Sequence, residues 1–263
     1  MTHENIYNVP NFLTLTRLIA APVVGYLILH DQHVWAAGLF AYAGITDLVD
    51  GWIARKWKLQ TVVGSVVDPM ADKLLMTILT VTLAIKGALP SKLFALTTST
   101  IANHYIVWLA TLILGRDVSL AIAAIYYRYA SLPSPKSLAR YWNFSLPSAE
   151  VHPTDISKYN TFLQLVLIGG ITLLPVAGTA ADALLTNISN GNIGIDGVMN
   201  AAQYLVAGTT VWSGASYLWT KDAVKILGPR SQEEKLRILS RGRVIIASCF
   251  LACGGIAMAL EYR

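Results

Sequence analysis

The stretch DLVDGWIARKWKLQTVVGSVVDPMAD, residues 47–72, places four aspartates between two long apolar runs. Asp47 and Asp50 are three residues apart, and Asp68 and Asp72 are four residues apart, so each pair would share one face of a helix. The connection between the two helices is short, which makes them antiparallel neighbours. Two acidic faces are therefore expected to meet near one end of a helical pair.

The composition around this stretch is that of a membrane protein. Of the 263 residues, 54% are hydrophobic and only 13% are charged, and the mean hydropathy is +0.52. Soluble domains usually carry about 25% charged residues. The net charge of +5 comes from loops, and no basic run interleaved with aromatic residues indicates a nucleic-acid partner. The sequence predicts an integral membrane protein in a lipid bilayer.

A helix that crosses a bilayer needs about 20 mostly apolar residues. Six runs reach that length, at residues 12–30, 34–54, 67–88, 93–127, 160–181 and 198–220. The run 93–127 is too long for one simple span, and we expect a single long or broken helix there. The fold class is therefore all-α, with about six transmembrane helices. A further run, 243–260, is a possible seventh span or an interfacial helix.

The loops and ends of the chain give an orientation and a division into parts. Lys and Arg gather in the connection 55–58, in the polar loop 131–157 with its flanks, and after residue 220, so these segments are expected on the inner side. The proline-rich loop makes continuous helix unexpected there. We expect a membrane domain over residues 1–227 and a C-terminal extension over 228–263. The N-terminal residues MTHENIYNVPNF show no pattern of a transit or signal peptide, so we expect either that the protein has no such segment or that this chain starts after one.

The four carboxylates indicate a cation site. In one low-dielectric pocket they repel one another and must take up protons or bind cations, and oxygen ligands suit Mg²⁺ or Mn²⁺. A pair of such ions is a common device for holding transferring phosphates. Acids that merely reach into the interface, and an ion-coupled transporter, are the alternatives. The nearby Gly51, Ala54 and Gly64 remove bulk beside the acids, and Arg55 can pair with phosphate.

The full pattern resembles the signature of the CDP-alcohol phosphatidyltransferase family. It reads Asp47-x₂-Asp50-Gly51-x₂-Ala54-Arg55-x₈-Gly64-x₃-Asp68-x₃-Asp72. The resemblance implies a homodimeric membrane enzyme that uses two divalent cations, Mg²⁺ or Mn²⁺, and displaces CMP from a CDP-linked donor. It also implies site residues: Asp47, Asp50, Asp68 and Asp72 as metal ligands, Asp72 also as the base, and Gly51, Ala54, Arg55 and Gly64 as the CDP site.

Other stretches resemble one branch of this family. Residues 8–22 are similar to the entry of the first span in phosphatidylglycerophosphate and cardiolipin synthases. Residues 115–144 and 152–164 are similar specifically to the mitochondrial CMP-forming cardiolipin synthases. This resemblance implies CDP-diacylglycerol and phosphatidylglycerol as substrates, cardiolipin and CMP as products, and the mitochondrial inner membrane with the active site on the matrix side. The alternative acceptor is glycerol 3-phosphate, used by phosphatidylglycerophosphate synthases.

An acceptor lipid with its own phosphate needs a cationic site. Arg17, Arg116 and Lys158 are the candidates, because Arg17 and Arg116 interrupt apolar runs and Lys158 lies in the second similar stretch. We expect Asp117 to be a poor partner for Arg116, since neighbouring residues on a helix do not face each other. Cys249 and Cys253, four residues apart in an apolar run, are expected to be two inert thiols.

Overall fold

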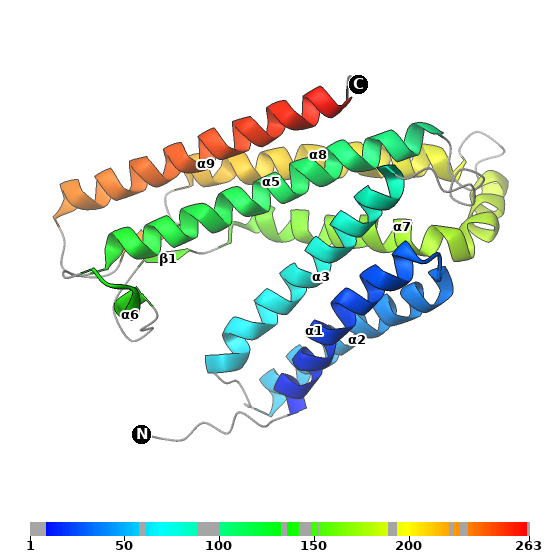
Figure 1. Cartoon of the computed structure of the whole chain (residues 1–263), viewed down its shortest axis with the longest axis horizontal. Helices are drawn as coiled ribbons and strands as arrows, with labels where there is room; N and C mark the ends of the chain where they lie inside the picture. Colours follow the sequence, from blue (N-terminus) through cyan, green and yellow to red (C-terminus); the bar gives the residue numbers. More distant parts are fainter. Residues whose placement is uncertain are drawn as a thin grey trace. The chain divides into compact units, whose positions relative to one another are not determined.

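The computed structural model describes residues 9–57, 62–88, 100–132, 136–141, 149–151, 153–188, 194–220, 224–226 and 231–261. These residues are mostly helical, which confirms the predicted all-α class (Figure 1). They fall into two compact units, one made of residues 1–106 and 165–200 and the other of residues 107–164 and 201–263.

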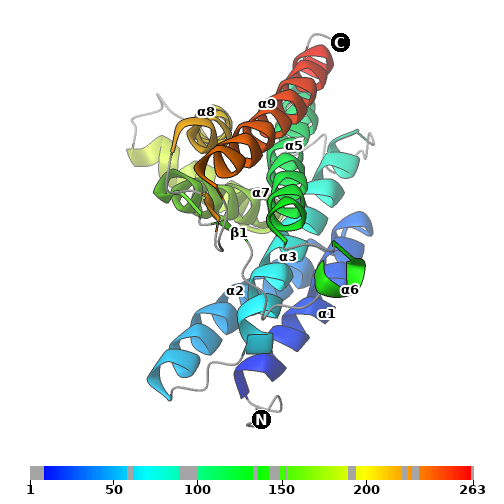
Figure 2. The ribbon, with the colours of Figure 1, turned by 90° about the vertical axis from the view of Figure 1, so that its left-hand side faces the viewer.

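The first unit is built on three helices, α1 (Val9–Leu29), α2 (His33–Lys56) and α3 (Val62–Ala88). Helix α1 packs against both α2 and α3 (Figures 1 and 2). Gly25 on α1 lies so close to α3 that an added Cβ would be 2.7 Å from Ile78 Cγ2. Small residues at such crossings let membrane helices approach closely, and here the approach brings the polar face of α1 between the other two helices.

The turn between α1 and α2 is held by a lysine from α3. Asp31 adopts a left-handed backbone with φ 62°, which aspartate tolerates better than most residues. Lys86 is buried and donates from Nζ to the Leu29 carbonyl oxygen at 3.2 Å and to the Asp31 carboxylate. This hydrogen bond and the charge of Lys86 hold the pKa of Asp31 below its ordinary value, although partial desolvation opposes the shift. Lys86 also places a cation at the negative end of α1.

The second unit contains the described residues within 107–164 and 201–263. Its elements are α5 (Thr100–Ser131) from Val107 onward, α6 (Leu138–Tyr141), β1 (Ala149–Val151), the start of α7 (Asp155–Ile188), α8 (Ile195–Trp219) from Ala201 onward, β2 (Val224–Ile226) and α9 (Gln232–Glu261). The described part of the loop 131–157 is not continuous helix, as predicted. Its short strand β1 pairs antiparallel with β2, Ala149 opposite Ile226, a pairing that the sequence did not predict.

Helix α9 packs against α5 through a glycine. At Gly115 on α5, an added Cβ would overlap the Cβ of Cys253 on α9. Cys249 and Cys253 are both free thiols, and their expected inertness stays a prediction. The predicted boundary between a membrane domain, 1–227, and an extension, 228–263, stays a prediction.

Four of the described helices contain segments long and apolar enough to cross a membrane. These segments are Asn11–Leu29, Val107–Ser131, Asp155–Ala177 and Gln232–Ala259. The last covers residues 243–259 of the predicted run 243–260, and α5 is one unbroken helix from Thr100 to Ser131. Helices also form where 34–54, 67–88 and 198–220 were expected. The protein is an all-α membrane protein, and the count of about six spans stays a prediction.

Candidate active site

Three aspartates from two helices meet on one arginine in the first unit. Arg17, on α1, donates from Nη1 to Asp47 Oδ1 at 2.6 Å and to the Asp72 carboxylate, and from Nη2 to the Asp50 carboxylate. Asp47 and Asp50 come from the last turns of α2, and Asp72 comes from α3. The structure thus brings the acidic faces of α2 and α3 together, as the spacing predicts, with a guanidinium between them.

This acidic cluster, made of Asp47, Asp50 and Asp72, is buried at one end and exposed to solvent at the other. The side chains of Arg17 and Asp50 are only 1% and 6% exposed, whereas those of Asp47 and Asp72 are 46% and 47% exposed. Arg17 Nη1 joins the two open carboxylates, and Nη2 binds the buried one. A molecule arriving from outside would therefore meet Asp47 and Asp72 first, with Asp50 beneath them.

The donors of the acidic cluster fit a divalent cation. All are carboxylate oxygens, the ligands that Mg²⁺ and Mn²⁺ prefer, and they already surround a positive group. Among the side chains that the structure describes, no three acidic, His or Cys groups stand close enough to share an ion. Because Arg17 lies between the carboxylates, an ion would have to take over ligands that Arg17 now binds.

The remaining signature residues lie on the same two helices. Gly51, Ala54 and Arg55 follow Asp50 in the last turns of α2, and Gly64 and Asp68 lie on α3 in the two turns before Asp72. The side chains of Ala54, Arg55 and Asp68 lie outside the described residues. Their predicted roles, and those of Gly51 and Gly64, stay predictions.

A second buried arginine lies in the second unit. Arg116, on α5, donates from Nη2 to Ser157 Oγ and to Ser213 Oγ, the latter at 2.7 Å. Its Nη1 pairs with Asp117 at 2.5 Å. The expectation that Asp117 is a poor partner was wrong, because the long arginine side chain can turn back along its own helix. Arg116 Nε is buried with no hydrogen-bond partner among the described residues.

Lys158 is placed differently from Arg116. It lies in the first turn of α7, with a side chain 62% exposed, and pairs with Asp155 at 2.9 Å. Its neighbour Ser157 is buried and contacts Arg116. Arg17 belongs to the first unit, and Arg116 and Lys158 belong to the second, so a shared acceptor site for these three residues stays a prediction.

The structure adds a buried polar band that the sequence analysis missed. Asn160 is fully buried, and its Oδ1 accepts hydrogen bonds from Thr209 Oγ1 at 2.9 Å and Thr210 Oγ1 at 3.0 Å. Gln164 Nε2 donates to Thr210 Oγ1 at 3.2 Å. The sequence does contain a pattern that could have predicted this band. Asn160 and Gln164 are four residues apart in an apolar run, and polar groups inside such helices usually bind one another.

The chain belongs to the CDP-alcohol phosphatidyltransferase family, whose model matches residues 7–212. It is 41% identical over 225 residues to a Schizosaccharomyces pombe protein named cardiolipin synthase (CMP-forming)/mitochondrial hydrolase fusion protein, covering 86% of this chain and 33% of that one. It is 42% identical over 175 residues to the human protein named cardiolipin synthase (CMP-forming), covering 66% and 53%.

A more distant relative carries a different name. The chain is 29% identical over 216 residues to a chloroplastic rice protein named CDP-diacylglycerol--glycerol-3-phosphate 3-phosphatidyltransferase 1, covering 81% of this chain and 57% of that one. The chain spans a third to about half of the length of the cardiolipin synthases that it matches. The resemblance found in residues 47–72 is confirmed at the level of the family.

Proposed function

We propose that this protein transfers the phosphatidyl group of CDP-diacylglycerol to phosphatidylglycerol and so forms cardiolipin and CMP. One observation carries the proposal: carboxylates of the family signature, from α2 and α3, converge on a single positive group at the end of a helical bundle. The higher identity to proteins named cardiolipin synthase than to the rice glycerol-3-phosphate enzyme supports phosphatidylglycerol as the acceptor.

The reaction balances as a displacement at phosphorus. The free hydroxyl of the phosphatidylglycerol headgroup attacks the phosphorus that carries the diacylglycerol. A new P–O bond forms, and the P–O bond to CMP breaks, so that CMP leaves with the bonding electrons. The proton of the hydroxyl goes to Asp72, whose half-exposed carboxylate lies at the open end of the acidic cluster.

We assign the acidic residues Asp47, Asp50, Asp68 and Asp72 as ligands of two divalent cations, Mg²⁺ or Mn²⁺. When bound, such ions neutralise diphosphate oxygens and stabilise charge on the departing CMP. Gly51, Ala54, Arg55 and Gly64 would form the site for the CDP group, where small residues leave room beside the helix backbones.

We assign the phosphodiester of the acceptor to Arg17, Arg116 and Lys158. Arg17 would contact it only after release from the carboxylates that it now binds. Arg116 supports this role through a buried guanidinium whose Nε has no described partner. For Lys158, the support is its exposed position beside Ser157, which itself contacts Arg116.

From the similarity to the cardiolipin synthases we infer that the protein lies in the mitochondrial inner membrane as a homodimer, with the acidic cluster on the matrix side. The distribution of Lys and Arg in the loops supports this orientation.

The purified full-length chain in detergent tests the proposal. It would receive CDP-diacylglycerol and Mn²⁺ or Mg²⁺, with phosphatidylglycerol in one reaction and glycerol 3-phosphate in another. We expect CMP release with phosphatidylglycerol. Release with glycerol 3-phosphate alone would establish the alternative acceptor. If no CMP is released with either acceptor and the protein carries ions across proteoliposomes, the alternative of an ion-coupled transporter would be favoured.

A further inference from the structure

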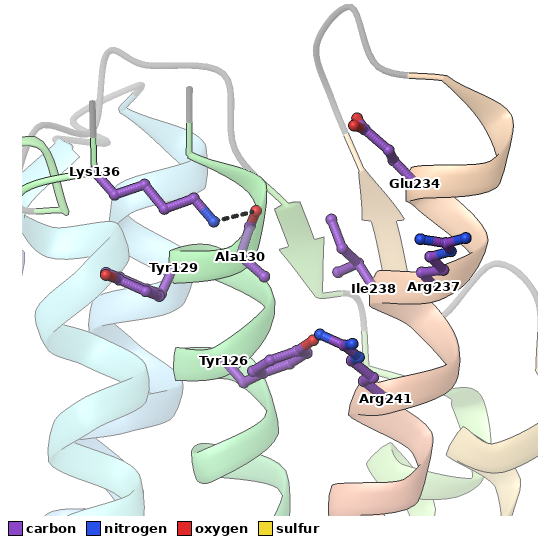
Figure 3. Close-up of a pocket in the computed structure, with 8 residues that line it drawn as sticks. All are labelled: Tyr126, Tyr129, Ala130, Lys136, Glu234, Arg237, Ile238 and Arg241. Atoms are coloured by element: carbon purple, nitrogen blue, oxygen red, sulfur yellow. Dashed lines mark hydrogen bonds between the residues drawn. The ribbon is translucent and has the colours of Figure 1, made fainter. Parts of the chain in front are cut away.

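A pocket of about 300 Å³ lies in the second unit, between the end of α5 and the start of α9 (Figure 3). Tyr126 and Tyr129 line it from α5, and Lys136 follows that helix. Arg237 and Arg241 line it from α9. The α9 wall lies beyond residue 212, where the match to the family model ends. None of the described residues that line the pocket belongs to the signature stretch 47–72.

The charges of the pocket favour an anion. Its lining contains three cations and one carboxylate, Glu234. Arg237 and Arg241 are four residues apart and so share one face of α9, and neither has an ion-pair partner in the part of the chain that the structure describes. Lys136 Nζ donates to the Ala130 carbonyl oxygen at 3.3 Å. Figure 3 shows the Lys136 side chain reaching that carbonyl.

The walls of the pocket are held by close packing. Ile238 belongs to a buried cluster with Tyr127 of α5, and the Tyr127 hydroxyl donates to the Leu239 carbonyl oxygen at 3.4 Å. At Gly242, an added Cβ would overlap the ring of Tyr127. A glycine there lets α9 come close enough to α5 for the two sets of polar side chains to line a single pocket.

The position of the pocket indicates a lipid. Both walls stand at the ends of segments long and apolar enough to cross a membrane, Val107–Ser131 and Gln232–Ala259. On α5, the exposed residues Val118, Ile122 and Ile125 form a stripe on the face that ends in Tyr129. A phospholipid matches this arrangement, with acyl chains along the stripe and a charged headgroup at the membrane surface.

We propose that this pocket binds the phosphodiester headgroup of an anionic phospholipid. Arg237, Arg241 and Lys136 would contact the phosphate oxygens, and the hydroxyls of Tyr126 and Tyr129 would donate to them. Binding at this pocket does not depend on the proposed reaction, because no residue of the acidic cluster takes part.

Dioctanoyl-phosphatidylserine is a suitable probe, since its headgroup is anionic and is not the proposed acceptor. Its Kd for the detergent-solubilised full-length chain would be measured by thermophoresis. A cation near an anionic lipid contributes about fivefold in affinity. The double variant Arg237→Ala/Arg241→Ala should therefore bind the probe about 25-fold more weakly. The matched control Lys235→Ala, on α9 but outside the pocket lining, should change Kd less than about twofold.

Three results would overturn the proposal. The first is a double variant that retains the wild-type Kd. The second is dioctanoyl-phosphatidylcholine binding as tightly as the anionic probe. The third is displacement of the probe by inorganic phosphate at millimolar concentration, because that displacement would indicate a phosphate site without lipid. Ile122→Ser/Ile125→Ser provides a second variant with the charges intact. We expect it to weaken lipid binding, and unchanged binding would also contradict a lipid seated on the α5 stripe.

Discussion

The carboxylates of the acidic cluster can be neutralised either by Arg17 or by divalent cations. Replacing Arg17 by alanine should leave only the cations to do so. In the structure, Arg17 binds Asp47, Asp50 and Asp72 at once and is itself 1% exposed. Without it, the carboxylates repel one another in a partly buried site. If divalent cations bind these same carboxylates, then Arg17→Ala should make the protein less stable without metal and more responsive to metal.

The magnitude follows from burial. Removing one partner of a buried ion pair costs about 3–5 kcal/mol of unfolding free energy, and here Asp50 is the buried partner. The pairs with the half-exposed Asp47 and Asp72 add at most about 1 kcal/mol each. The total cost is then about 3–7 kcal/mol. At about 2–4 °C per kcal/mol for a chain of this size, we expect the Tm in EDTA to fall by about 6–28 °C.

The assay is thermal unfolding of purified wild type and Arg17→Ala in detergent, in EDTA and with increasing Mn²⁺. A ligand at 100 times its Kd stabilises a protein by about 2.7 kcal/mol, so Mn²⁺ should restore several degrees to the variant. The rise in wild type should be smaller, because Mn²⁺ must first displace Arg17 from the carboxylates.

Lys86→Ala is the matched control. Lys86 is also a buried cation bound to a carboxylate, Asp31, but it lies outside the acidic cluster. Its loss should lower Tm and leave the Mn²⁺-induced rise as in wild type. Equal Mn²⁺-induced rises in wild type and Arg17→Ala, or an unchanged Tm of Arg17→Ala in EDTA, would refute competition between Arg17 and metal for the same carboxylates.

Three further predictions concern other positions. Asp68→Asn should insert into membranes normally and release CMP at least about 100-fold more slowly, because a metal ligand is lost; a wild-type rate would contradict its assignment. Gly25→Val should lower the unfolding free energy by about 1–3 kcal/mol, because its Cβ would overlap α3. In Gly38→Ala, the added Cβ meets no atom of another described segment within 4 Å, so Tm should not fall; equal losses of Tm in the two variants would contradict the close approach. The hydrogen bond from Lys86 lowers the pKa of Asp31 in the folded state. The charged form of Asp31 therefore stabilises the fold fully above about pH 4, and this stabilisation is lost as the pH falls further. The Tm of Asp31→Asn should fall less than the Tm of wild type between pH 5 and pH 3, and identical profiles of Tm against pH would contradict this.

The sequence predicted the acidic cluster because its geometry is local. The i,i+3 spacing of Asp47 and Asp50 fixes their shared helix face, and the short connection to α3 brings Asp72 to the same region. The place of Arg17 could not be predicted in this way, because it depends on how α1 packs between α2 and α3. Its apolar surroundings indicated a buried cation that needs a partner, but any of several acids could have supplied one.

The features that the sequence missed depend on long-range packing. The pairing of β1 with β2 joins residues about 75 apart, and neither strand has a distinctive pattern of its own. The hydrogen bonds of Asn160 cross from α7 to α8. The pairing of Arg116 with Asp117 was excluded on average helix geometry, which does not account for the reach of a long side chain.

The stoichiometry of lipid formation tests the proposed reaction most directly. The purified full-length chain would be given CDP-diacylglycerol and phosphatidylglycerol labelled with ¹³C in its headgroup glycerol, and both CMP and labelled lipid would be quantified by mass spectrometry. We predict one CMP for each labelled cardiolipin, and no cardiolipin when CDP-diacylglycerol is left out. Labelled cardiolipin formed without CDP-diacylglycerol, with release of glycerol from a second phosphatidylglycerol, would contradict CMP displacement at the aspartates of residues 47–72.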